Sequence, residues 1–380
     1  MAKLGDFISP AKNIKCGDGK YPVLSMTMHD GIVLQSDRFK KSLASADQSG
    51  YKVVDYGQLV VGFPIDEGVL YLQRVIEQGI MSPAYNVWDV DYSHVDPSYF
   101  ELSLHSPQAM QYYKENLRGS TARRRSLPKE VLLELPLKMP SMDEQKRVAT
   151  SIDKLTHLID MRSKQLDKLD ELVKSRFIEM FGDPVLNPKG WDVVKIGDIA
   201  TEVKYGTSLP AVEGGKYPYL RMNNMTNDGH LDLSNLKYID VPDDEIEKCI
   251  VRKGDVLFNR TNSVELVGKT CVFDLDEEMI IAGYIIRVRI HETMLPIIFS
   301  NYMNTDVIKQ YLRKIAKGAV NQANINAKEL QAIQIYLPPL DLQNQFADFV
   351  AQVDKSKLAV QKSLEQLEIL KKALMQEYFG

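Results

Sequence analysis

Hydrophobic residues recur with a heptad spacing in two stretches of the chain. From Val148 to Met180 they alternate at intervals of four and three, and the same register recurs from Phe346 to Tyr378. Such spacing places one apolar stripe along a long α-helix. Each stripe is interrupted twice by a basic residue, at Arg162 and Arg176 and at Lys357 and Lys371. The pattern predicts two helices, the first of which would run about 58 Å at 1.5 Å per residue.

The two helices belong to a repeat of the whole sequence. Residues 131–182 align without a gap with residues 329–380 at a constant offset of 198, and both segments end in Phe-Gly. Weaker matches extend the repeat, for example 3–7 with 195–199 and 20–26 with 216–222. We therefore expect four segments in the order A-B-A′-B′. Their predicted bounds are 1–138, 139–182, 183–338 and 339–380, with the two helices in the second and fourth.

A helix of this length cannot bury its stripe alone. Each helix could pack on its own globular neighbour, or the two could pack on each other as an antiparallel coiled coil, which would relate the globular domains by a pseudo-twofold axis. We favour the coiled coil. Its predicted interface residues are Ile152, Leu155, Ile159, Leu166, Leu169, Val173, Val350, Val353, Val360, Leu364, Leu367 and Leu374.

The remaining segments lack sustained helical periodicity. Short β-rich runs, such as 58–63, 255–258 and 279–289, alternate with turn-forming residues, and two helical patterns cover 107–117 and 305–316. The sequence thus predicts an α/β fold class, with two globular mixed α/β domains joined by two long helices in an internal pseudo-twofold repeat.

Matching basic patches lie at the ends of the two short helical patterns. Arginine can grip phosphate or read guanine, and asparagine and glutamine can read adenine, so these residue types suit DNA recognition. A solvated charged face is the competing interpretation, and the polar segment 259–269 could equally be a turn held by its own side chains. The candidate DNA-binding residues are Lys114, Arg118, Arg123, Arg124, Arg125, Arg221, Asn223, Arg260, Asn262, Arg313, Lys314, Lys317, Asn321, Gln322 and Asn324.

Composition narrows the class of protein. With 44% hydrophobic and 26% charged residues in 380, the chain matches an ordinary folded protein, and its net charge of −4 means that any polyanion site must be local. The N-terminus has no signal-peptide core, and the most apolar stretch, 279–299, contains several charged residues. We therefore expect a cytoplasmic protein without a membrane span.

Signatures of catalysis are missing from the sequence. Three widely spaced cysteines and six scattered histidines predict no metal site, and no glycine-rich nucleotide or S-adenosylmethionine motif occurs. Glu144-Gln-Lys146 matches half of a nuclease signature, but it falls in the first turn of a predicted helix. We expect no catalytic residue, no cofactor and no enzyme activity of the chain alone.

Several motifs together resemble one protein family. These are the run at 337–343 (Leu-Pro-Pro-Leu-Asp-Leu-Gln) with its partner at 139–145, the Phe-Gly helix ends, the segment 191–199 and the Gly-Lys-Thr-Cys segment 268–271. In this order they are similar to the specificity subunits of type I restriction-modification enzymes. The resemblance covers essentially the whole chain, although the first globular segment has no recognisable counterpart of Trp191 or of the 259–269 loop.

The resemblance implies a function in DNA recognition. It implies two target recognition domains that each read one half of a bipartite duplex, held apart by helices that act as a ruler. It also implies methyltransferase and restriction subunits as partners, with S-adenosylmethionine, ATP and magnesium on those partners. A coiled-coil scaffold that binds non-DNA partners is the main alternative, and a self-sufficient modification enzyme is a third.

Overall fold

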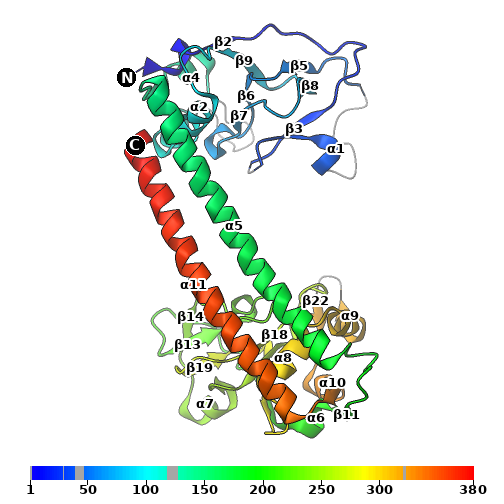
Figure 1. The fold of residues 1–380 in the computed structure, drawn as a ribbon. Coiled ribbons are helices and arrows are strands. Elements are labelled where there is room, and N and C mark those ends of the chain that lie inside the picture. The colour runs from blue at the N-terminus through cyan, green and yellow to red at the C-terminus, as the bar shows by residue number, and fades with distance from the viewer. Residues whose placement is uncertain (1, 29, 39–46, 118–126, 320–321) are drawn as a thin grey trace. The chain divides into compact units, whose positions relative to one another are not determined.

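The computed structural model describes all residues except 1, 29, 39–46, 118–126 and 320–321. The chain divides into two compact units. Unit 1 contains residues 1–162 and 362–380, and unit 2 contains residues 163–361. The two longest helices, α5 (Met142–Phe181) and α11 (Leu340–Phe379), each contribute one part to each unit (Figure 1).

Unit 1 is a mixed α/β body around a small antiparallel sheet in the order β2-β9-β6-β7, with the two-stranded pairs β1-β10, β3-β4 and β5-β8. Its strands are β1 (Ala2–Lys3), β2 (Ile8–Pro10), β3 (Leu24–Met26), β4 (Ile32–Leu34), β5 (Lys52–Asp55), β6 (Leu59–Val61), β7 (Leu70–Leu72), β8 (Gln78–Met81), β9 (Asn86–Val90) and β10 (Pro136–Leu137). Its shorter helices are η1 (Leu4–Asp6), α1 (Gln35–Arg38), η2 (Ile65–Glu67), α2 (Pro97–Leu104), α3 (Pro107–Asn116) and α4 (Lys129–Leu133).

Unit 2 has the matching sheet β12-β20-β16-β18 and the pair β11-β23, and it adds the sheets β14-β13-β19-β15 and β17-β22-β21. Its strands are β11 (Asp192–Lys195), β12 (Ala200–Tyr205), β13 (Tyr217–Leu220), β14 (Lys237–Ile239), β15 (Ile250–Val251), β16 (Val256–Asn259), β17 (Thr261–Asn262), β18 (Thr270–Val272), β19 (Met279–Ile281), β20 (Ile285–Ile290), β21 (Lys317–Ala319), β22 (Gln322–Asn324) and β23 (Gln334–Leu337). Its shorter helices are α6 (Ile196–Ile199), η4 (Met222–Asn224), α7 (Asp243–Cys249), α8 (Pro296–Asn304), α9 (Asp306–Ile315) and α10 (Ala327–Gln331).

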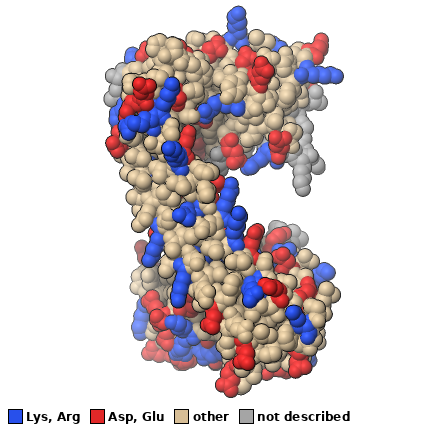
Figure 2. Space-filling view, viewed as in Figure 1, with Lys and Arg blue, Asp and Glu red and all other residues tan. Residues whose placement is uncertain are grey.

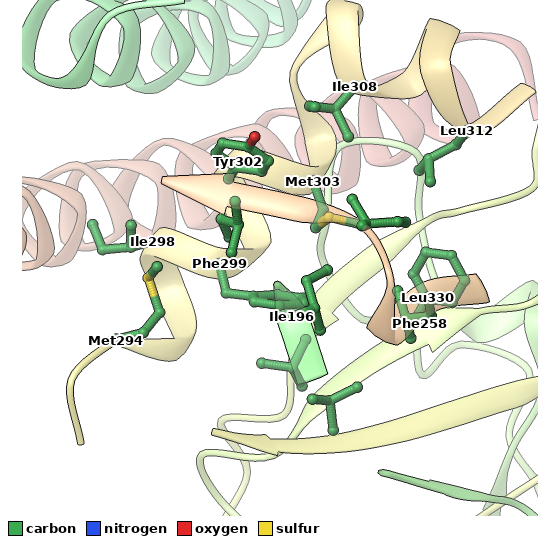
Figure 3. Packing of buried hydrophobic residues seen from close by; sticks show 14 of the residues in the cluster. Ile196, Phe258, Met294, Ile298, Phe299, Tyr302, Met303, Ile308, Leu312 and Leu330 are labelled. Carbon is green, nitrogen blue, oxygen red and sulfur yellow. The ribbon is translucent and has the colours of Figure 1, made fainter. Parts of the chain in front are cut away.

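The largest core lies in unit 2 and joins its globular part to the helices. Phe299 and Met303 of α8 point toward Ile196 and Phe258 (Figure 3). The same cluster contains Phe346 at the start of α11, together with aromatic residues near the end of α5. In unit 1 the corresponding contact joins Tyr99 of α2 and Ile152 of α5 to Phe379 at the end of α11. In each unit the two helix segments therefore run in opposite directions.

The repeat is visible in the way each helix is anchored. Gln145 is buried near the start of α5, accepts a hydrogen bond from the Asp96 N–H at 2.9 Å and donates to the carbonyls of His94 and Pro140. Gln343 is buried at the matching place in α11 and makes the equivalent three bonds, to the Leu295 N–H and to the carbonyls of Thr293 and Pro338. One buried amide thus fastens each helix start to its own globular part.

The helix bounds follow from local sequence. The Ser141 hydroxyl accepts a hydrogen bond from the Glu144 N–H at the start of α5, which is one half of a capping box. At its end Gly182 adopts φ +84°, a conformation that disfavours any residue with a Cβ atom. In both long helices every position of the predicted seam, from 148 to 180 and from 346 to 378, is buried or half-buried.

One predicted β-rich run is divided into two strands. The run 279–289 forms two strands, β19 and β20, because the chain turns at Gly283 between them. In the part of the chain that the structure describes, no helix has the length and apolar character needed to cross a membrane.

Candidate nucleic-acid interface

A three-stranded sheet in unit 2 brings together several residues that lie far apart in sequence. Strand β17 pairs with β22, so that Thr261 is opposite Asn324, and β22 pairs with β21, so that Asn324 is also opposite Lys317. The pairing joins the 259–269 loop to the 317–324 segment. The predicted site residues that meet here are Arg260, Asn262, Lys317, Gln322 and Asn324.

Arg260 is the centre of this group. Its guanidinium donates to the side-chain oxygen of Asn324 at 3.1 Å and to the Gly283 carbonyl at 3.3 Å, and it lies over the Tyr205 ring at 4.8 Å. Asn324 in turn donates to the Thr261 hydroxyl at 3.0 Å. Because the protein already uses these hydrogen-bonding groups, Arg260 and Asn324 orient one another and hold the two strands together.

The loop itself is held by buried amides. The fully buried Asn259 donates to the carbonyls of Thr261 and Tyr284, and its side-chain oxygen accepts from Asn262 at 2.8 Å. The Asn262 oxygen accepts from the Ser263 N–H. The predicted reader Asn262 is therefore engaged within the loop, as the competing turn interpretation proposed for this segment.

Helix α9 clamps the far end of the loop. The Lys309 ammonium donates to the Gly268 carbonyl at 2.8 Å, and Arg313 donates to the Glu265 carbonyl at 3.3 Å. Burial lowers the pKa of Lys309 to about 7, and the positive charges of Arg313, Lys269 and Lys174 add to the effect. The loop is thus bordered by positive charge that has main-chain carbonyls as its hydrogen-bond acceptors.

A second set of polar groups on this side of unit 2 is exposed. The side chains of Lys314 and Gln322 make no hydrogen bond or ion pair to any described residue, whereas Lys317 is paired with Glu329 at 2.5 Å. The residues Tyr205 and Tyr284 are 42% and 49% exposed. Sequence reasoning missed both tyrosines because neither lies in a basic run. Exposed aromatic rings can stack on bases or on guanidinium groups.

Two further candidates lie on the segment that follows β13. The Arg221 guanidinium donates to the Asn235 carbonyl at 2.9 Å, and Asn223 is exposed in η4. Among the described residues, no hydrogen bond, ion pair or ring contact joins either residue to the Arg260 group. In the described part of the chain, Arg221 and Asn223 are therefore not members of the hydrogen-bonded group around Arg260.

Of the DNA-binding residues predicted in unit 1, the structure describes Lys114. Lys114 is exposed on α3 and has no polar partner among the described residues. Arg118, Arg123, Arg124, Arg125 and, in unit 2, Asn321 lie outside the described residues. On the face shown in Figure 2, basic and acidic side chains are interspersed over the globular parts.

The predicted helix-seam residues form one further set. Ile152, Leu155, Val173, Val350, Val353 and Val360 are buried, and Ile159, Leu166, Leu169, Leu364, Leu367 and Leu374 are half-buried. Asp170, Asp228 and His230 form the one group of possible metal ligands among the described residues, with ligand atoms within 4.8 Å of one another. The ammonium of Lys357 contacts both Asp170 and His230 and so already supplies positive charge there.

Comparison with protein families gives a match over part of the chain. Residues 188–369 match the family described as "Type I restriction modification DNA specificity domain". This segment contains the 259–269 loop, the β17-β22-β21 sheet and α9.

Relatives with curated names belong to the same group. The putative type I restriction enzyme MjaX specificity subunit of Methanocaldococcus jannaschii is 29% identical over 50% of this chain and 46% of that protein. The EcoKI specificity subunit of Escherichia coli K12 is 22% identical over 65% of this chain and 57% of that protein. The chain thus spans about half the length of these two relatives. The MjaVIII specificity subunit of M. jannaschii is 22% identical over 99% of this chain and 90% of that protein.

Solved structures show the fold. A chain from a structural study of complex assembly and conformational transition of the type I R-M system matches with a TM-score of 0.61 at 17% identity, over 100% of this chain and 96% of that one. The type I S subunit of M. genitalium matches with a TM-score of 0.51 at 15% identity, over 100% and 95%. At these identities the likeness concerns the mixed α/β fold.

Proposed function

We propose that this chain, which belongs to the family of type I restriction-modification specificity subunits, recognises a bipartite sequence in double-stranded DNA. The main support is the family match to residues 188–369. This segment contains Arg260, Asn324 and the residues bonded to them. In this proposal unit 1 and unit 2 each read one half-site. The domain bounds 1–138, 139–182, 183–338 and 339–380 belong to the same proposal.

Within unit 2 we assign different tasks to the two sets of residues. Arg260, Asn262 and Asn324 shape the interface, because their polar groups bond to one another and to the main chain. Gln322 and Lys314 are exposed and have no polar partner among the described residues, so they contact DNA, the amide at a base edge and the ammonium at phosphate. Tyr205, whose ring lies against Arg260, and Tyr284, whose carbonyl bonds to Asn259, are exposed and could stack on bases.

We propose further that α5 and α11 form an antiparallel coiled coil that acts as the ruler. Support comes from the burial of the seam positions and from the opposite directions of the two helix segments in each unit. Each helix has 40 residues, which corresponds to about 60 Å. With one DNA turn per roughly 34–36 Å, the centres of the two half-sites would lie between one and two turns apart.

Partners complete the proposed activity. Methyltransferase subunits and a restriction subunit would dock on this chain, and S-adenosylmethionine, ATP and magnesium would bind to those partners. The chain then contributes sequence choice and supplies no catalytic group. Purified chain that transferred methyl groups without a partner would refute this division of labour.

The first experiment combines a genomic methylation map, which gives the target sequence, with duplex binding at several salt concentrations. We expect Lys314→Ala to weaken binding to all sequences and to reduce the slope of log affinity against log salt by about one. We expect Gln322→Ala to relax base choice at one position, by about 1–3 kcal/mol.

The matched control is Lys253→Ala, because Lys253 is an exposed lysine that is paired with Asp276 at 2.7 Å. It should leave affinity and slope unchanged. Affinity that does not depend on salt would favour the scaffold alternative. If Lys253→Ala and Lys314→Ala changed the DNA affinity and its salt slope equally, Lys314 would be a solvated surface residue without a contact to DNA.

A further inference from the structure

A charged cluster in unit 2 joins both long helices to the globular part. The Lys357 ammonium, on α11, bonds to the Asp170 carboxylate of α5 and lies 3.2 Å from the Nε2 atom of His230. His230 belongs to the segment between η4 and β14, and its Nε2 atom is 3.7 Å from Asp170 and 4.0 Å from Asp228. Three segments that are distant in sequence therefore meet at one lysine.

Lys357 occupies a seam position of the heptad pattern. Its side chain is 11% exposed, and the neighbouring seam residues Val353 and Val360 are buried. A charged residue at such a position costs stability, but it specifies how helices are aligned when its partner is fixed. Here the partner Asp170 is itself held beside His230 of the globular part.

The surroundings of Lys357 are acidic. Besides Asp170, the carboxylates of Asp228 and Asp354 lie within electrostatic range of Lys357, and Asp274 lies within range of Asp354. Burial raises the pKa of Asp354, an effect that the positive charge of Lys357 opposes. Without the ammonium, these negative carboxylates would repel one another. The cluster therefore favours the arrangement in which Lys357 lies between them.

Apolar packing does not fill the space next to the cluster. A cavity of about 760 Å³ is lined by Val173, Phe177 and Val350 of the helices and by Leu231 and Asn304 of the globular part. Close-packed side chains normally restrict how two elements can be oriented. The buried core around Phe346 already restricts the helices on one side of this cavity, and the charged contacts add a restriction on the other.

The repeat contains no second copy of the cluster. At the offset of 198, the counterparts of Lys357 and Asp170 are Ile159 and Glu368, both in unit 1. In unit 1, Phe379 of α11 packs against Tyr99 of α2 with their rings 4.9 Å apart, and Arg147 of α5 donates a hydrogen bond to the Tyr378 hydroxyl of α11 at 3.2 Å. A feature found in one copy alone is not required by the shared fold.

We propose that Lys357 is a positioning residue that, with Asp170 and His230, fixes the orientation of the globular part of unit 2 on the helix segments. The inference rests on the proposed function in one respect. If unit 2 reads a half-site, this orientation limits which spacer lengths the chain accepts. The cluster would then set spacing tolerance without any contact to DNA.

The first test measures orientation without DNA. Spin labels are attached at Lys355→Cys on α11 and Lys248→Cys on α7, both exposed in unit 2. Double electron–electron resonance then gives the distribution of distances between the two labels. We expect the distribution to broaden in Lys357→Met and Asp170→Asn, and Lys357→Arg to restore its width. The control is Lys371→Met, because Lys371 is a half-buried basic seam residue in unit 1 without a charged partner among the described residues.

The second test uses the full chain with its methyltransferase partner and duplexes whose half-sites are separated by different spacers. Lys357→Met should reduce discrimination against altered spacers about tenfold, as loss of a charged hydrogen bond implies, while half-site sequences stay the same. Unchanged label distances and unchanged spacer choice in folded Lys357→Met would overturn the proposal. A wild-type chain that prefers no duplex would instead refute the proposed function, and the label distances would still decide the role of Lys357.

Discussion

The two units share an anchoring scheme but differ in what surrounds it. Both fasten a helix start with one buried glutamine, and both hold the carbonyl of the final Phe-Gly glycine with a side chain, Lys138 for Gly380 and Tyr336 for Gly182. Around this common scheme unit 1 uses aliphatic packing and one aromatic pair, whereas unit 2 adds a phenylalanine cluster, a buried arginine and the Lys357 cluster. The repeat preserves the attachment of the helices and varies its environment.

The two tryptophans allow each unit to be followed separately. The chain has two, Trp88 in unit 1 and Trp191 in unit 2. Single-tryptophan variants, with the other residue replaced by phenylalanine, would report unfolding of one unit at a time. The predictions below use this readout in denaturant titrations.

The largest difference should come from the aromatic cluster. Phe346 is fully buried against Phe177 and Phe181, with ring centroids 5.4 and 5.6 Å away, and its counterpart in unit 1 is Val148. We expect Phe346→Ala to cost about 4 kcal/mol in the free energy of unfolding of unit 2, and Val148→Ala about 2 kcal/mol in unit 1. Equal costs would mean that the aromatic cluster adds nothing to the shared scheme.

The buried arginine should give the next largest effect. Arg287 is fully buried, bonds to Glu202 and to the Ile250 carbonyl, and lies 4.0 Å from Asp255, whereas strand register places Val87 at this position in unit 1. Arg287→Ala would leave the carboxylates of Glu202 and Asp255 without this partner. We expect the free energy of unfolding of unit 2, measured by Trp191 fluorescence, to fall by about 3 kcal/mol. Trp88 fluorescence should report no change in unit 1.

The glutamine anchors should behave alike. Gln145→Ala and Gln343→Ala each leave one N–H and two carbonyls without their partner, so each should cost about 2 kcal/mol in its own unit. Leucine at the same positions would keep the volume and isolate the cost of the hydrogen bonds. An effect confined to one unit would contradict the equivalence of the two anchors.

The smallest effect should be a pH dependence of unit 2. Burial raises the pKa of the Glu202 carboxyl, but hydrogen bonds and charges from Lys204, Arg287 and Arg289 outweigh it and hold the pKa below its usual value. A depressed pKa contributes stability above the unfolded value, about 4.5, and that stability is lost as pH falls through the folded pKa. In Glu202→Gln, the free energy of unfolding of unit 2 should therefore decline less steeply below about pH 5 than in the wild type. Trp191 fluorescence in denaturant titrations measures this decline. A slope that did not change would remove Glu202 from the acid response.

The comparison also shows what the sequence alone could predict. The bounds of α5 and α11 follow from heptad spacing and the Phe-Gly ends, since both signals are local in sequence. The engagement of Arg260 by Asn324 depends on pairing of strands 64 residues apart, and no local pattern reports that pairing. Likewise Lys357 stands out in sequence as a break in a stripe, but its partner His230 is 127 residues away.

The composition of unit 1 has a consequence for the order of folding during synthesis. Its helical support includes residues 362–380, which leave the ribosome after all of unit 2. Domains of most proteins fold from the N-terminus as they emerge. Here the first globular part emerges first, yet Tyr99 and Ile152 gain their contact with Phe379 last. The nascent chain must therefore keep this apolar surface soluble until translation has passed through the whole second unit.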